Sequence, residues 1–258
     1  MKSDSPQPDA SPAWARFYNE VGGRFATSVA PRIRELYERT ETGRSNRSLL
    51  DVCCGTGQLA RHFLDNGYRV TGIDLSEARL HYARANAGDH LHRGRARFIC
   101  ADASDFRLDR EFGVATSTFD ALNLLQSLDA LRRCFRCVAS SVVANGLFVF
   151  DLMTKRGFWE DYNGQWVMDT ENALYVYRSI YSGGEKATSR MVGFVRGDAG
   201  SWERFDEYRT PTFFDTGTVI ETLHETGWKD VKVTSTDDLD EPVSDTEALD
   251  RAFFIAST

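Results

Sequence analysis

Residues 49–57 read Leu-Leu-Asp-Val-Cys-Cys-Gly-Thr-Gly, and this stretch decides the fold. An apolar run reaches an acid, Asp51, and then enters a short segment that contains Gly55 and Gly57. A helical pattern begins directly afterwards, over 58–66. A strand that passes through a glycine turn into a helix lets a ligand lie against bare backbone, and the helix N-terminus adds free N–H donors. The stretch therefore predicts a ligand site at this turn.

A second expected strand, residues 69–73, ends in another acid, Asp74. In a parallel sheet this carboxylate lies at the carboxyl edge of the neighbouring strand, where it can hold a ribose diol. Together the glycine turn and Asp74 predict a nucleoside-type ligand.

The same alternation of strand and helix continues through the first part of the chain. It predicts a parallel sheet with helices on both faces and right-handed crossovers. The expected strands are 48–53, 69–73, 96–101, 112–118 and 147–151, and the expected helices are 58–66, 76–87 and 127–141, with Asn145-Gly146 as the turn before the last strand.

The pattern changes after Asp151. Residues 164–213 alternate polar and apolar residues, are rich in aromatic residues and contain two glycine turns, which predicts an antiparallel meander of three or four strands. A helix over 216–226 and short strands near 229–235 and 250–256 follow. Before the first strand, residues 13–42 show two helical stretches that are split at Gly22-Gly23.

Composition and charge restrict the class of protein. The net charge of −7 gives no general attraction to nucleic acid or to anionic membranes. No apolar run reaches the roughly 18 residues of a membrane span, and residues 1–12 lack the apolar core of a secretory signal. Five cysteines in such a chain are typical of a reduced, cytoplasmic protein. The Cys134/Cys137 pair falls in a helical pattern, so we expect no metal site.

Two cofactors fit a glycine turn followed by an acid: a nicotinamide dinucleotide and S-adenosylmethionine. Asp51 lies just before the turn, where it suits an ammonium group and repels a pyrophosphate. Asp102 directly follows the third strand and can accept a hydrogen bond from an adenine amino group. These acids favour S-adenosylmethionine, with S-adenosylhomocysteine as the product.

With these features the chain resembles the class I S-adenosylmethionine-dependent methyltransferases over roughly residues 13–258. It is similar to the small-molecule group of natural-product pathways, which includes enzymes that methylate amino-sugar nitrogens. Residues 49–57, 70–76, 98–103, 112–123 and 145–151 match the successive family motifs.

The resemblance implies a Rossmann-like α/β fold: a doubly wound, mostly parallel seven-stranded sheet with an N-terminal helical lid and a β-meander insert after the fifth strand. The expected organisation is a flexible tail (1–12), the lid (13–46), the cofactor-binding core (47–152), a substrate-binding insert (153–213) and the C-terminal helix and strands of the core (214–258).

The resemblance also implies roles for individual residues. Asp51, Cys53, Gly55 and Gly57 are expected to border the methionine moiety, and Asp74 to take the ribose hydroxyls. Leu75, Arg79, Asp102 and Ala103 are expected around the adenosine, Ser117 is expected to approach the ligand from the fourth strand, and Tyr18 is expected as a lid over the cofactor. Two departures stand out: Cys53 replaces a glycine, which is tolerable with a negative φ, and Arg79 replaces a frequent methionine.

The acceptor site is expected between the lid, the loop 118–123 and the meander. Tyr18, Phe119, Asp120 and Asn123 are the candidates for catalysis, with Asp120 ordering an amine or accepting its proton. The candidate substrate wall comprises Phe119, Asn123, Trp166, Tyr175, Tyr177, Arg178 and Tyr208.

None of the five histidines falls in the expected acceptor region, which favours proximity-driven N-methylation of a small-molecule amine in an antibiotic-type pathway. O- or C-methylation of a phenolic or carboxylate metabolite is the main alternative, and a non-catalytic nucleoside-binding module is a remote one. We expect no nucleic-acid or membrane partner, and the edge strands of the meander could pair with a second copy.

Overall fold

The computed structural model describes residues 11–109, 111–198 and 200–258. Most of the expected tail, residues 1–10, lies outside these ranges. Its last two residues belong to the start of helix α1 (Pro12–Phe17). Ser11 is the N-cap, and its side chain accepts a hydrogen bond from the Trp14 N–H. Pro12 suits the first helical position because its missing N–H would be unpaired there.

The central sheet has seven strands in the order β10-β11-β5-β4-β1-β2-β3. All neighbouring pairs are parallel except those of β11, which runs antiparallel to β5 and β10. This confirms the doubly wound, mostly parallel sheet. The strands are β1 (Ser48–Val52), β2 (Arg69–Asp74), β3 (Ala96–Cys100), β4 (Phe112–Ser117), β5 (Val142–Met153), β10 (Val231–Thr234) and β11 (Arg251–Ser257).

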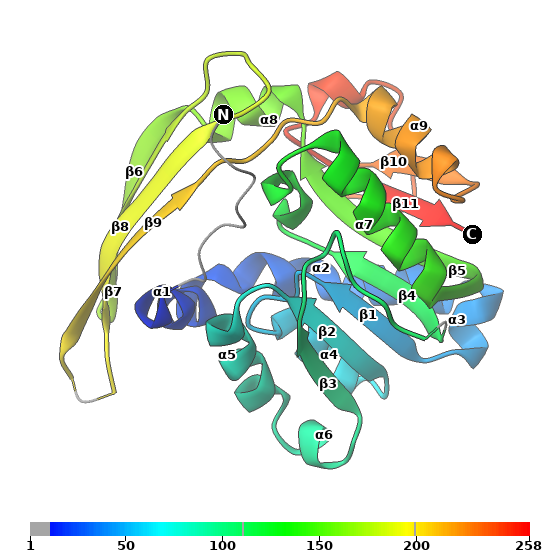
Figure 1. The fold of residues 1–258 in the computed structure, drawn as a ribbon, viewed down its shortest axis with the longest axis horizontal. Coiled ribbons are helices and arrows are strands. Elements are labelled where there is room, and N and C mark those ends of the chain that lie inside the picture. Colours follow the sequence, from blue (N-terminus) through cyan, green and yellow to red (C-terminus); the bar gives the residue numbers. More distant parts are fainter. Residues whose placement is uncertain (1–10, 110, 199) are drawn as a thin grey trace.

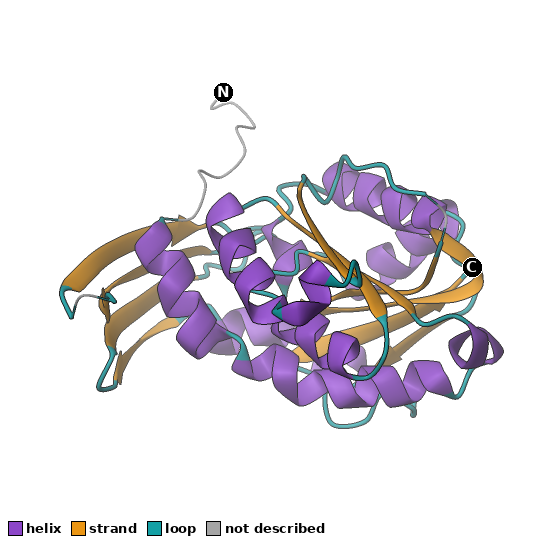
Figure 2. Cartoon of the chain, turned by 90° about the horizontal axis from the view of Figure 1, so that it is seen from below, coloured by secondary structure: helices purple, strands orange, loops and turns teal. Residues whose placement is uncertain are grey.

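Helices cover both faces of the central sheet (Figures 1 and 2), and successive residues of its buried strands pack into two different clusters. Leu49 packs in one cluster with helices α2 (Arg24–Glu38), α4 (Gln58–Asp65) and α5 (Glu77–Ala87). Leu50 packs in the other, with α7 (Leu128–Ser141) and α9 (Thr216–Glu225).

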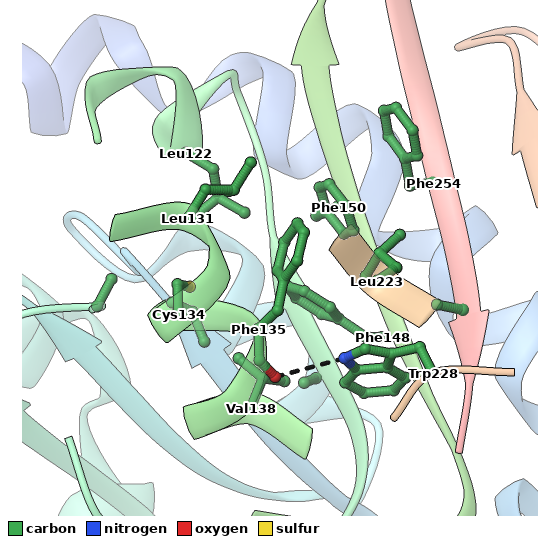
Figure 3. Packing of buried hydrophobic residues seen from close by; sticks show 14 of the residues in the cluster. Leu122, Leu131, Cys134, Phe135, Val138, Phe148, Phe150, Leu223, Trp228 and Phe254 are labelled. Carbon is green, nitrogen blue, oxygen red and sulfur yellow. Dashed lines mark hydrogen bonds between the residues drawn. The ribbon is translucent and has the colours of Figure 1, made fainter. Parts of the chain in front are cut away.

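Figure 3 shows the second cluster, in which aromatic rings of α7, β5 and β11 stack. Trp228 lies beside Phe148, and its indole N–H donates to the Phe135 carbonyl. Burial on both faces explains the continuous apolar runs 147–150 of β5 and 252–256 of β11.

Strand β5 differs from the prediction. Asn145-Gly146 is not a turn before the strand, because β5 already begins at Val142, where it pairs with Phe112. The register then shifts, and regular pairing resumes at Val114 and Leu147. Asn145 adopts a positive φ of 58° within this irregularity, which is a β-bulge-like insertion and not a hairpin turn.

The insert after β5 is a four-stranded antiparallel sheet in the order β6-β7-β8-β9, which confirms the expected meander. Its strands are β6 (Gly164–Asp169), β7 (Ala173–Ile180), β8 (Thr188–Arg196) and β9 (Trp202–Arg209). A short helix that the sequence pattern did not predict, α8 (Lys155–Asp161), leads into it.

Helix α1 packs against one face of this sheet, and the segment η1 (Tyr18–Gly22), a single π-helical turn, joins α1 to α2 (Figure 1). The remaining short helices are α3 (Glu41–Ser45), α6 (Asp89–His92), η2 (Ala121–Leu124) and η3 (Thr246–Ala248). In the described part of the chain, no helix has the length and apolar character that a bilayer crossing requires.

Candidate active site

A cavity of about 1180 Å³ lies between the carboxyl edge of the central sheet and the inner face of the four-stranded sheet. Helix α1 and η1 close one side. Of the residues singled out from the sequence, the following line it: Tyr18, Cys53, Asp74, Leu75, Arg79, Asp102, Ala103, Phe119, Asp120, Trp166, Tyr175, Tyr177 and Tyr208.

The glycine turn after β1 has the left-handed backbone that its sequence predicts. Gly55 and Gly57 have φ values of 56° and 80°. A Cβ on Gly57 would lie 3.1 Å from Ala83, so the glycine also lets α4 and α5 pack closely. Cys53 has a φ of 58°, which contradicts the expected negative value. A non-glycine residue in this region is strained, and such strain is typical of functional sites.

Asp51 and Ser117 lie at the carboxyl ends of the adjacent strands β1 and β4, buried beneath the cavity. Oδ1 of Asp51 accepts a hydrogen bond from the Thr116 hydroxyl at 3.0 Å. Its Oδ2 and the Ser117 Oγ have no partner within the described chain. Burial raises the pKa of Asp51 to about 7. A buried carboxylate with an unpaired oxygen calls for a hydrogen-bond donor or a cation.

Asp74 at the end of β2 is held from several directions. Its Oδ2 accepts from the Gly55 N–H and its Oδ1 from the Ser76 N–H, both at 2.9 Å. Arg79 on α5 adds an ion pair with Oδ1 at 3.0 Å. Arg79 therefore contacts Asp74, the carboxylate that is expected to bind ribose. The Nε of Arg79 has no partner among the described residues.

The residues expected around adenine lie on the loops after β2 and β3. The Asp102 carboxylate accepts from the Ser104 N–H at 2.7 Å, which fixes the turn beside Ala103. Leu75 is 43% exposed although it borders a cavity, which leaves an apolar surface for a ring to cover.

Tyr18 begins the π-helical turn and lies between the two glycine segments. A Cβ on Gly22 would lie 2.6 Å from its ring, and one on Gly55 would lie 3.1 Å away. The absence of side chains at both positions lets the tyrosine ring lie flat over the turn after β1. Burial raises the pKa of Tyr18 to about 12, so its hydroxyl stays protonated at neutral pH.

The loop after β4 is held by residues that the sequence reasoning did not select. Phe119 and Asp120 both have positive φ values, 67° and 48°. The Asp151 carboxylate at the end of β5 accepts from both of their N–H groups, at 2.7 and 2.8 Å. These two bonds hold a backbone that would otherwise be unfavourable.

Arg251 of β11 links this loop to the C-terminal strand. It forms ion pairs with Asp120, at 2.8 Å, and with Asp151. Asp120 also accepts a hydrogen bond from the Tyr162 hydroxyl at 2.5 Å. The Asp120 carboxylate therefore already accepts from two donors, and its expected role in ordering an amine stays a prediction. The only sequence signal for Arg251 is a charge at the start of the apolar run 252–256.

The other predicted wall residues separate into two groups. Trp166, Tyr175 and Tyr177 form an aromatic cluster on the inner face, with ring centroids 5.0 and 5.2 Å from Trp166. Tyr208 is 60% exposed, and Arg190 packs over its ring.

Asn123 and Arg178 do not line the cavity. Asn123 is buried and bonds the backbone of Thr212 and Met153. Arg178 is exposed and donates to Gln165. The structure therefore places Asn123 as a support for the loop after β4 and Arg178 on the outer face of the insert.

Comparison with known proteins identifies the family. Residues 49–146 match the Methyltransferase domain family. A dTDP-3-amino-3,4,6-trideoxy-alpha-D-glucopyranose N,N-dimethyltransferase of Streptomyces venezuelae is 31% identical over 214 residues, 80% of this chain and 84% of that protein. The chain belongs to the S-adenosylmethionine-dependent methyltransferases.

Solved structures show the same fold. An S-adenosylmethionine-dependent methyltransferase from Clostridium acetobutylicum superposes with a TM-score of 0.76 at 18% identity, covering 94% of this chain and 96% of that one. A sugar N-methyltransferase from Streptoalloteichus sp. superposes with a TM-score of 0.73 at 22% identity, covering 100% and 96%.

The residues of this methyltransferase fit S-adenosylmethionine. The unpaired Oδ2 of Asp51 suits an ammonium group, and the unpaired Ser117 Oγ is a further polar partner at the same edge. Gly55 has no side chain, which lets Tyr18 lie against the turn after β1, where the methionine part of the donor is expected. A carboxylate at the end of β2 and an exposed leucine beside it suit a ribose and an adenine ring.

Proposed function

We propose that this methyltransferase transfers a methyl group to the nitrogen of a small-molecule amine, with an amino sugar of an antibiotic-type pathway as the leading class of acceptor. The relative from Streptomyces venezuelae is an amino-sugar N,N-dimethyltransferase, and another from Streptomyces fradiae, 35% identical over 105 residues, carries a similar name. The cavity of about 1180 Å³ is large enough for an acceptor beside the donor.

The donor supplies an electrophilic methyl group on a sulfonium. In the proposed arrangement Asp51 holds the ammonium of its methionine part, Asp74 and Arg79 hold the ribose, and Asp102 with Ala103 borders the adenine. Tyr18 covers the turn after β1 and excludes water from the transfer path. These residues bind and orient the donor, and none of them needs to move a proton.

The observation that carries N-methylation is the chemistry of the acceptor wall. Aromatic rings from β6 and β7 face the loop after β4, and no histidine occurs among the described residues that line the cavity. An amine needs no general base if it arrives neutral, and an apolar wall favours the neutral form by penalising the ammonium. Holding the nitrogen in line with the methyl group can supply about 7–11 kcal/mol of the barrier.

The proposal also places the reaction in the cytoplasm. None of the five cysteines forms a disulfide in the described structure, which is typical of a reducing compartment.

The decisive experiment uses a donor with a deuterated methyl group. The purified chain is incubated with a panel of amino sugars and with matched phenols and carboxylates, and the products are analysed by mass spectrometry. We expect label only on nitrogen. Labelled phenols or carboxylates would instead establish O-methylation, and donor binding without any labelled product would indicate a non-catalytic module.

Asp74 tests the donor site separately from the acceptor. Asp74→Ala should weaken donor binding by about 1–3 kcal/mol because the ribose hydroxyls lose a charged partner. Calorimetric titration measures the change. Asp206→Ala is the matched control, because that carboxylate pairs with Arg190 and Arg204 on the insert. Equal donor affinity in the two variants contradicts the ribose assignment.

A further inference from the structure

Arg209 is the last residue of β9 and lines the cavity from the side opposite the central sheet. It pairs with Ser189 of β8, which lies two residues before the inner-face residue Met191. Met191 in turn pairs with Tyr177 of β7. Its guanidinium carbon lies 5.0 Å from the centroid of the Trp14 ring on α1. This cation–π contact holds the side chain over the cavity and leaves its N–H donors available.

Arg209 differs from most other arginines of the cavity wall. Arg79 pairs with Asp74, Arg251 with Asp120, and Arg133 with Asp129. Within residues 11–109, 111–198 and 200–258, no hydrogen bond or ion pair is made by the Arg209 guanidinium. Arg24 also borders the cavity without such a partner, but it is exposed to solvent.

The surroundings leave the charge of Arg209 uncompensated. Burial lowers its pKa, and the neighbouring Arg79 lowers it further. Asp120, a carboxylate that interacts electrostatically with Arg209, already accepts hydrogen bonds from Arg251 and Tyr162. Glu207, on the same face of β9, accepts two hydrogen bonds from Ser11. A sulfonium donor would bring one more positive charge into the same cavity.

We propose that Arg209 binds an oxyanion of the methyl acceptor, a phosphate or a carboxylate that presents two oxygens to the guanidinium. This inference deepens the proposed function and rests on it for the identity of the occupant. A planar guanidinium binds such groups through two parallel hydrogen bonds. An acceptor anion would neutralise the cavity and would anchor the substrate on the insert, while its amine reaches the loop after β4.

The test compares Arg209→Gln with Arg209→Lys and with Arg204→Gln. Arg204 lies on the same strand but on the outer face, where it pairs with Asp206. Each full-length protein is first loaded with S-adenosylhomocysteine, and its affinity for that product is measured by calorimetry. The loaded proteins are then titrated with inorganic pyrophosphate and, separately, with succinate. Far-UV circular dichroism confirms that every variant is folded.

We expect wild type to bind at least one of the two anions, and Arg204→Gln to bind that anion with the same affinity as wild type. Arg209→Gln should bind it about 10- to 100-fold more weakly, and Arg209→Lys should fall between, because it keeps the charge without the paired donors. Product affinity should be unchanged in all variants. A preference for pyrophosphate or for succinate distinguishes a phosphate from a carboxylate acceptor.

Three outcomes would overturn the inference. Equal anion binding by Arg209→Gln and wild type, or no anion binding by any protein, removes the subsite. A loss of product affinity in Arg209→Gln assigns the arginine to the donor carboxylate instead. If anion binding depends on Arg209 but no amine is methylated, the subsite stands and the proposed N-methylation fails, so the two failures are distinguishable.

Discussion

The strained residues of this chain concentrate around its cavity. Cys53, Phe119 and Asp120 are all non-glycine residues with positive φ, and all three border the cavity. The Asp151 carboxylate holds Phe119 and Asp120 in place by accepting hydrogen bonds from their backbone N–H groups. Single residues in sparsely populated conformations cost on the order of 1–3 kcal/mol, so the surrounding structure must compensate. These strained residues therefore border the cavity in which we propose that donor and acceptor meet.

Asp51 supports a prediction about pH. Burial keeps its carboxyl protonated up to about pH 7 in the folded protein, whereas its ordinary pKa is 3.8. The folded state therefore holds one more proton between these values, and this group makes the ligand-free protein less stable as the pH rises through that range. Asp51→Asn should remove this loss, so the variant gains stability relative to wild type from pH 4.5 to about pH 7.

Urea unfolding at a series of pH values measures the difference. Donor affinity should rise with pH through the same window in wild type and stay flat in Asp51→Asn, because an ammonium binds the ionised carboxylate. A difference between wild type and Asp51→Asn that does not change with pH contradicts the argument.

At the scale of elements, helix α1 packs against the four-stranded sheet of the insert. Phe17 packs with ring centroids 4.5 Å from Tyr175 and 5.0 Å from Phe205. Ser11 adds hydrogen bonds to Glu207, and Arg16 pairs with Asp198. The adjoining η1 turn places Tyr18 over the glycine turn of β1. The lid is therefore positioned by the antiparallel sheet.

Phe17→Ala tests this coupling. The variant should lose about 3–5 kcal/mol of stability because a fully packed ring is removed. Residues 12–22 should exchange amide hydrogens faster, and the donor should bind more weakly because Tyr18 is released. Phe194→Ala, on the exposed face of the same sheet, is the matched control. Equal donor affinity in the two variants would show that the lid is held independently of the insert.

At the scale of the whole molecule, the cavity is built from two sheets that share no strand. The central sheet supplies the carboxylates of the expected donor site, and the antiparallel sheet supplies the aromatic wall and Arg209. A ligand that fills the cavity therefore contacts both parts at once and links them.

This arrangement predicts a joint response to S-adenosylhomocysteine. At a concentration about 100-fold above its dissociation constant, binding should add about 2.7 kcal/mol and raise Tm by about 5–10 °C. Amide exchange should slow both in the loops after β1–β3 and in residues 12–22. Protection confined to the central sheet would show that the lid does not close over the product.

The central fold could be predicted because its signals are local. Buried strands, helix caps and the glycine turn each follow from the residues that form them, as Ser76 and Ser127 show by capping α5 and α7 where the pattern places those helices. The bulge in β5 could not be predicted, because it depends on pairing with β4. Residues such as Asp51 and Asp74 could be selected because they lie beside the turns that define the motif.

The sequence by itself determined the fold class, the position of the glycine turn and the acids at the ends of the strands, since short-range periodicity and backbone chemistry specify them. Only the tertiary structure decided which charges are satisfied. It brought Arg251 to Asp120 across 131 residues, turned Arg178 outward and enclosed the Asn123 amide. It also left Arg209 over the cavity without an ion-pair partner among the described residues. The physical reason is that pairing and burial depend on neighbours that are distant in the chain, which no local pattern of residues encodes.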